Sequence, residues 1–214
     1  MNHTMFQLFN NKKMNMKHNI PAQYEGKDLN ISDSIEFENE IAAKNFYLEA
    51  KNRLLQINNW DDIAKVSAST FQHLDSFGNY SNEKPEEGDY VKIDIPGPGL
   101  YSTGGYDFVK IEQISETNEP NNDLITMTLR PSSKPDDEDD HETKHFFKNL
   151  ASSTFQVKRN GRIVEANYYG RNELINTELD SLIDRIRNLF VAFGAKLGAS
   201  YPQWKSLISG ILNK

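Results

Sequence analysis

The 214-residue chain contains no cysteine. This absence excludes disulfide bonds, cysteine nucleophiles and metal sites built on thiolates. A cysteine-free chain fits a reducing compartment, so we expect a cytoplasmic location. The chain also lacks an excess of positive charge, because its formal net charge at pH 7 is −7. That balance disfavours nucleic acid and anionic membrane surfaces as general partners.

Long apolar runs are missing as well. No run approaches the roughly 18 residues that a membrane-spanning helix needs, so no membrane span is expected. The first residues carry lysines without an apolar segment of useful length, and we predict no signal peptide. Residues 1–30 are predicted to form a poorly ordered extension. Since no linker divides the apolar segments that follow, residues 31–214 are predicted to form one domain.

Familiar catalytic and metal-binding motifs are absent too. The acidic run at 136–140 lacks the spaced ligands of a calcium loop, and no H-E-x-x-H or G-x-S-x-G occurs. The glycine-rich segment 96–105 leads into a strand and has no G-K-[ST], so it is either a mobile loop at a cavity mouth or an irregular turn. We predict no metal, cofactor or catalytic residue. His73 leaves two alternatives open: a general base facing a cavity, or a hydrogen-bonded structural histidine.

The longest periodic stretch is residues 177–198, for which we predict a helix of about 30 Å. Its apolar stripe consists of Leu179, Leu182, Ile183, Ile186, Leu189, Phe190, Phe193 and Leu197. A helix of this kind needs a surface to dock on, because burial of its stripe only offsets the entropy lost on ordering it. Further helices are predicted at 42–57, at a short turn beginning with Trp60, and at 202–212.

Most of the chain between these helices alternates as strands do. Clear examples are 89–96 and 123–131, and a first strand is predicted within 31–41. Phe108 and Val109 interrupt one alternation, which indicates a bulge or burial on both faces. Asn160-Gly161 predicts a two-residue type I′ hairpin that places Val157 opposite Val164.

This order of elements resembles the helix-grip fold of the START-like (SRPBCC) superfamily, which includes birch-pollen-allergen-like and polyketide cyclase-like proteins. The opening segment, residues 34–63, SIEFENEIAAKNFYLEAKNRLLQINNWDDI, is similar to the superfamily's opening strand and helix, with Asn59-Trp60 at the helix end. The helix is longer than usual, and the tail helix at 202–212 has no counterpart in the minimal fold. The resemblance implies an α+β fold in which a curved antiparallel sheet wraps around the long helix.

The resemblance also implies an apolar cavity between the sheet and that helix, although a filled core explains the stripe equally well. The residues expected to line the cavity are Trp60, Tyr106, Phe108, Tyr168, Arg171, Ile186, Phe190 and Phe193. Arg171 either pairs with a ligand carboxylate or ties down the corner between strand and helix. Three functions follow as alternatives: binding of a small apolar or amphipathic molecule such as a lipid, a cyclase-like enzyme, or a scaffold for a protein partner. No pattern specifies an oligomeric state.

Overall fold

The computed structural model describes residues 20–24, 26–65, 70–94, 106–135, 151–173 and 204–213. Three predictions lie outside the described residues: the long helix at 177–198, the glycine-rich segment and the acidic run. The fold below is that of the remaining chain, which contains an antiparallel sheet and the helices that pack on it.

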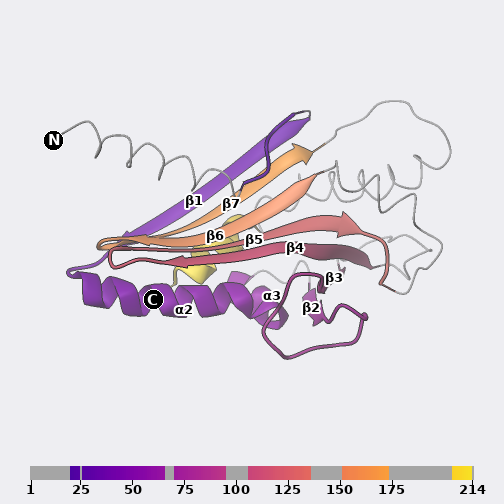
Figure 1. Cartoon of the computed structure of the whole chain (residues 1–214), viewed down its shortest axis with the longest axis horizontal. Helices are drawn as coiled ribbons and strands as arrows, with labels where there is room; N and C mark the ends of the chain where they lie inside the picture. The colour runs from indigo at the N-terminus through magenta and orange to yellow at the C-terminus, as the bar shows by residue number, and fades with distance from the viewer. Residues whose placement is uncertain are drawn as a thin grey trace.

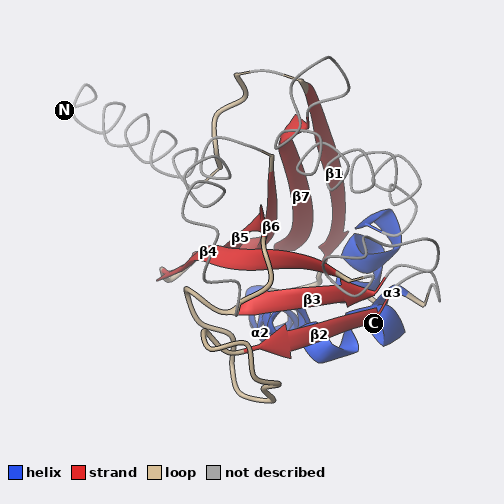
Figure 2. Ribbon diagram, turned by 90° about the vertical axis from the view of Figure 1, so that its right-hand side faces the viewer, coloured by secondary structure: helices blue, strands red, loops and turns tan. Residues whose placement is uncertain are grey.

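Seven strands form one antiparallel sheet in the order β1-β7-β6-β5-β4-β3-β2. Figure 2 shows how strongly the sheet twists, since β1 and β7 stand steeply in a view where β2 and β3 run almost horizontally. The strands are β1 (Lys27–Glu36), β2 (Thr70–Leu74), β3 (Tyr90–Asp94), β4 (Asp107–Asn118), β5 (Asn122–Ser132), β6 (Ser152–Asn160) and β7 (Ile163–Glu173). The predicted class, α+β with a curved antiparallel sheet, is confirmed.

The strand boundaries differ from prediction at β1. This strand begins at Lys27, inside the segment predicted to be an extension, and ends at Glu36. Pairing with β7 explains the early start, because Leu29 lies opposite Gly170 and gains ladder hydrogen bonds that local sequence does not reveal. Ile41, predicted to belong to the strand, lies in the following helix because Asn39 caps that helix by accepting a hydrogen bond from the Ala42 N–H.

The helices between β1 and β2 follow the predicted order. They are α2 (Glu40–Leu55), the 3₁₀ turn η1 (Ile57–Asn59) and α3 (Trp60–Ala64). Figure 1 shows α2 running along one face of the sheet. Its predicted apolar positions Phe46, Ala50 and Leu54 are all buried against that face. The order of strand, helix, short helix and six antiparallel strands is therefore confirmed for the described residues.

The tail helix, residues 204–211, belongs to the core. Its side chains Trp204, Leu207, Ile208 and Ile211 are 5%, 0%, 1% and 0% exposed, so the predicted stripe is present and buried. Trp204 stacks on Tyr168 of β7 with ring centroids 5.5 Å apart. The tail helix is therefore part of the core and not an addition to the fold.

Contacts from three elements hold the tail helix in place. The Arg53 guanidinium of α2 donates hydrogen bonds to the carbonyls of Ile211 and Asn213, which satisfies groups at the helix end. The Ser209 hydroxyl donates to the Asp33 carboxylate of β1. At Gly210 the helix approaches α3 so closely that a Cβ atom would lie 2.0 Å from the Ile63 carbonyl oxygen. Only glycine fits this approach.

The predicted hairpin exists, but its register differs by two residues. Asn160 pairs with Ile163, so Gly161 and Arg162 form the turn and Val157 lies opposite Ala166 instead of Val164. Gly161 has a φ of +58° and Arg162 has no positive φ, which excludes type I′. Because the shift is even, each side chain keeps its predicted face. Val157, Val164 and Ala166 all lie in the core.

The interrupted alternation in β4 reflects burial on both faces. Val109 belongs to the main core, whereas Phe108 packs on the opposite face with Leu74 and Tyr90. The irregularity in register lies further on, between Ile111 and Gln113. Of the two predicted explanations, two-sided burial therefore accounts for Phe108.

Candidate functional site

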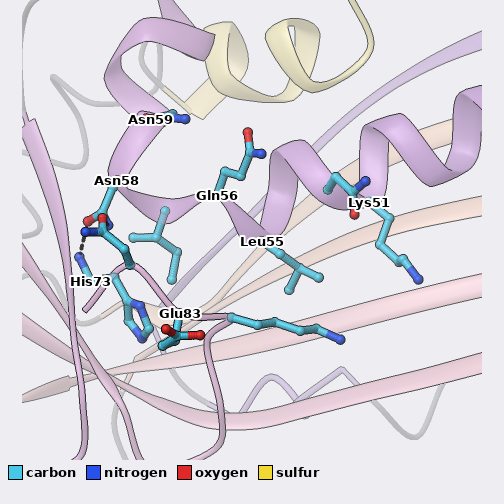
Figure 3. Close-up of a pocket in the computed structure, with 11 residues that line it drawn as sticks. Lys51, Leu55, Gln56, Asn58, Asn59, His73 and Glu83 are labelled. Carbon is cyan, nitrogen blue, oxygen red and sulfur yellow. Dashed lines mark hydrogen bonds between the residues drawn. The ribbon is translucent and has the colours of Figure 1, made fainter.

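A groove lies beside the C-terminal end of α2. Its volume is about 480 Å³, within the range of pockets that hold small molecules. The groove joins α2, η1, β2 and the loop before β3, and Figure 3 shows Lys51 at one end, Asn58 and His73 at the other, and Leu55 between them. The lining residues are Lys51, Asn52, Leu55, Gln56, Ile57, Asn58, Asn59, His73, Asn82, Glu83 and Lys84.

Asn58 holds the walls of this groove together. Its side-chain oxygen accepts a hydrogen bond from the His73 backbone N–H at 2.7 Å, and its amide nitrogen donates to the Ser81 carbonyl at 2.8 Å. The Ser81 N–H in turn donates to the His73 carbonyl. One amide from η1 therefore fixes both β2 and the loop after it, so the groove has a preformed shape.

His73 reaches the groove from β2 and is held from behind by Asp89. The imidazole Nε2 lies 2.8 Å from the Asp89 Oδ2, and His73 is only 2% exposed. The same carboxylate oxygen accepts a hydrogen bond from the Glu86 backbone N–H at 2.9 Å. His73 is therefore hydrogen-bonded, as one of the two alternatives predicted, and it also lines the groove, so a role beyond structure stays open.

The charge at the other end of the groove is balanced. Lys51 Nζ lies 2.7 Å from the Glu116 carboxylate of β4. Partial burial of Glu116 acts to raise its pKa, but hydrogen bonds from Lys51 and Asn118, together with the charges of Lys51 and Lys84, outweigh it and lower the pKa below 4.5. Glu116 therefore stays ionised at neutral pH, and the Lys51 ammonium that lines the groove forms an ion pair with it.

The remaining amides of the groove are available to a ligand. Asn52, Gln56 and Asn59 are exposed and make no side-chain hydrogen bond to the rest of the described chain. Each carboxamide offers both a donor and an acceptor. Leu55 is 9% exposed and supplies a small apolar area, whereas Ile57 lines the groove from the core and is 1% exposed. The groove therefore combines hydrogen-bonding groups with a small hydrophobic area.

The sequence-predicted site residues do not gather at this groove. Trp60 and Tyr168 lie in the closed core, where Trp60 packs against Phe71 and Phe155 and its indole N–H donates to the Leu54 carbonyl. Tyr168 is fully buried, stacks on the tail helix and hydrogen-bonds with Ser153. These aromatic side chains fill space between the sheet and the tail helix.

The other predicted residues lie elsewhere. Tyr106 and Phe108 belong to the cluster on the opposite face of the sheet, where the Lys92 ammonium sits 3.5 Å from the centre of the Tyr106 ring. Arg171 donates hydrogen bonds to the Gly170 carbonyl and the Asn30 side chain, so it joins β7 to β1. Ile186, Phe190 and Phe193 lie outside the described residues. A ligand-binding role for these eight residues stays a prediction.

Sequence reasoning missed nearly all of the groove. Its residues come from three segments, 51–59, 73 and 82–84, and no local motif joins them. The available signal was the run of amides at Gln56, Asn58 and Asn59. We interpreted Asn58 and Asn59 only as the end of a helix, and Gln56 as part of that helix. Among the described residues, no cluster of His, Asp and Glu could hold a metal ion, and no helix there is long and apolar enough to cross a membrane.

Comparison with solved structures gives matches of low identity. A hypothetical protein, jhp0584, from Helicobacter pylori matches with 7% identity over 89% of this chain and 96% of its own, at a TM-score of 0.41. The major latex-like protein 151 from Panax ginseng matches with 12% identity over 80% and 98%, at a TM-score of 0.33. The Aha1 dimer from Colwellia psychrerythraea matches with 10% identity over 80% and 95%, at a TM-score of 0.28.

No protein-family model matches the chain, and no curated protein sequence matches it. The described strands and helices themselves show an α+β protein in which helices pack on a seven-stranded antiparallel sheet.

Proposed function

We propose that this protein binds a small amphipathic molecule non-covalently in the groove beside α2. The observation that carries the proposal is a preformed groove of about 480 Å³ in which unpaired amides lie beside Leu55, the lining apolar side chain that keeps some exposure, at 9%. Such a lining suits a ligand with both hydrogen-bonding groups and a compact apolar part. Lys51 is paired with Glu116. The other charged lining residues, Glu83 and Lys84, carry opposite charges, so the groove favours a neutral ligand over an ionised one.

This proposal refines the expectation of an apolar or amphipathic ligand. The cavity predicted between the sheet and the 177–198 helix lies partly outside the described residues and stays a prediction. Where the described core faces the tail helix, Phe71, Phe155, Tyr168 and Trp204 contact one another directly. The amphipathic alternative is supported by the lining of the groove, whereas a purely apolar ligand would leave its amides without partners.

The test uses 2-naphthol, a neutral amphipathic fluorophore, in a titration of the full-length protein. We expect saturable binding with a Kd of about 10–100 μM, as a small aromatic ligand with one or two hydrogen bonds would give. The substitution Asn52→Trp fills the groove from an exposed position on α2 and should abolish this binding while leaving the thermal midpoint unchanged.

Asn45→Trp is the matched control. Asn45 is also exposed and lies two turns earlier on α2, away from the groove, so binding should persist in this variant. Equal loss in both variants, or undiminished binding in Asn52→Trp, would place the ligand elsewhere. Native mass spectrometry of the freshly purified protein would then identify any ligand that co-purifies.

A further inference from the structure

The imidazole of His73 has a defined tautomer. Asp89 Oδ2 is an acceptor when ionised, and it already accepts the Glu86 backbone N–H. Its 2.8 Å contact with His73 Nε2 is therefore a hydrogen bond in which Nε2 donates. In the neutral imidazole the other nitrogen, Nδ1, must then be bare and can act only as an acceptor.

That acceptor has no partner among the described residues. Neighbouring polar groups are already used: Asn58 bonds the backbone of His73 and Ser81, and Asp89 bonds Nε2. Nδ1 is not among the fully buried side-chain atoms that lack a partner, so it keeps contact with solvent, and a donor supplied by a ligand can replace water there. Since His73 lines the groove, such a ligand could present that donor from the groove side.

We propose that His73 is the specificity-determining residue of the groove and selects ligands that carry a hydroxyl donor. In the complex, the ligand's O–H donates to His73 Nδ1, and its apolar part covers the exposed edge of Leu55. The side-chain amides of Asn52, Gln56 and Asn59 accept hydrogen bonds from, or donate them to, further polar groups of the ligand. The ligand class is therefore a neutral, hydroxylated amphipathic molecule, and this assignment rests on the proposed function of the groove.

Two matched probes test the selection. 2-Naphthol has a hydroxyl donor, and 2-methoxynaphthalene has the same rings with the donor removed. We expect 2-naphthol to bind the full-length protein about fivefold more tightly, the ratio that one hydrogen bond exchanged with water typically provides. Equal affinities would overturn the selection by His73 while leaving groove binding intact. If neither probe binds, both the selection and the proposed function fail.

Substitutions at position 73 separate the two imidazole nitrogens. In His73→Gln the amide nitrogen replaces Nε2 and keeps the bond to Asp89, but the acceptor at Nδ1 is lost. In His73→Asn the amide oxygen replaces Nδ1 and keeps that acceptor. The preference for 2-naphthol should fall to about one in His73→Gln and persist in His73→Asn, with circular dichroism confirming that both variants fold. The opposite pattern would overturn the proposal.

A measurement on the unmodified protein checks the tautomer directly. Nitrogen-15 NMR at pH 8 distinguishes a bare imidazole nitrogen from a protonated one. We expect Nδ1 of His73 to be bare in the free protein and to shift on addition of 2-naphthol but not of 2-methoxynaphthalene. A free protein with the proton on Nδ1 would contradict the assignment, because that nitrogen could not accept a hydroxyl.

Discussion

The core beneath the tail helix and the groove beside α2 both include residues of α2, yet their side chains have opposite chemistry. In the core, aromatic side chains from β2, β6, β7 and the tail helix meet ring to ring, as the contacts of Trp204 with Phe71 and Phe155 show. In the groove, amides and charged groups lie beside Leu55, which keeps a small exposed area. The helix α2 contributes to both regions, since its buried face serves the core and its last turn serves the groove.

This difference separates the residues that stabilise the fold from those that are free to bind. Closed apolar contacts supply most of the folding free energy, so substitutions there should lower stability strongly. The groove has few such contacts, and substitutions there should change ligand binding more than stability. Three stability predictions follow, in addition to the binding experiments on the groove.

Trp204→Ala should have the largest effect. Removing this indole opens a cavity among Phe71, Phe155 and Tyr168, and we expect the free energy of unfolding to fall by about 3–5 kcal/mol in a urea titration. Trp204→Phe keeps most of the packing and should lose less. A Trp204→Ala protein with the stability of the parent would show that the tail helix does not hold the core.

Gly210→Ala should have the next largest effect. It should lower the free energy of unfolding, whereas the same change in most helices raises it. In an exposed helix this change would stabilise by about 1 kcal/mol. Here the new methyl group would collide with the Ile63 carbonyl oxygen, so we expect a loss of about 1–3 kcal/mol. Lys205→Ala, at an exposed position of the same helix, is the control for helix propensity. Stabilisation by Gly210→Ala would mean that the tail helix lies further from α3.

Glu116→Gln should have the smallest effect and should depend on pH. The folded protein lowers the pKa of Glu116, so the unfolded chain takes up a proton first as the pH falls. The stability that Glu116 contributes is therefore present above pH 4.5 and lost below it. For a partly exposed pair we expect Glu116→Gln to lose less than about 1 kcal/mol at pH 7. Parent and variant should converge in urea titrations at low pH, and a constant difference would exclude this ion pair as the cause.

Local patterns in the sequence determined much of the secondary structure. Alternation located the strands around Val91, Ile125 and Val157, and helical spacing located α2 through Phe46, Ala50 and Leu54. These patterns succeed because each element exposes one face to the core and the spacing of that face depends only on backbone geometry. Asn160-Gly161 likewise marked the hairpin, and the turn missed its predicted position by one residue.

Only the tertiary structure decided which elements meet. The apolar stripe of the tail helix has the same sequence pattern whether the helix lies on the surface or in the core. Its burial depends on a partner surface formed by Phe71, Phe155 and Tyr168, which are distant in the chain. The groove depends likewise on Asn58 joining η1 to β2. The sequence by itself determined the faces of the strands and helices. Packing between distant segments decided that aromatic residues predicted to bind a ligand fill the core, and that polar residues at the end of α2 line the groove.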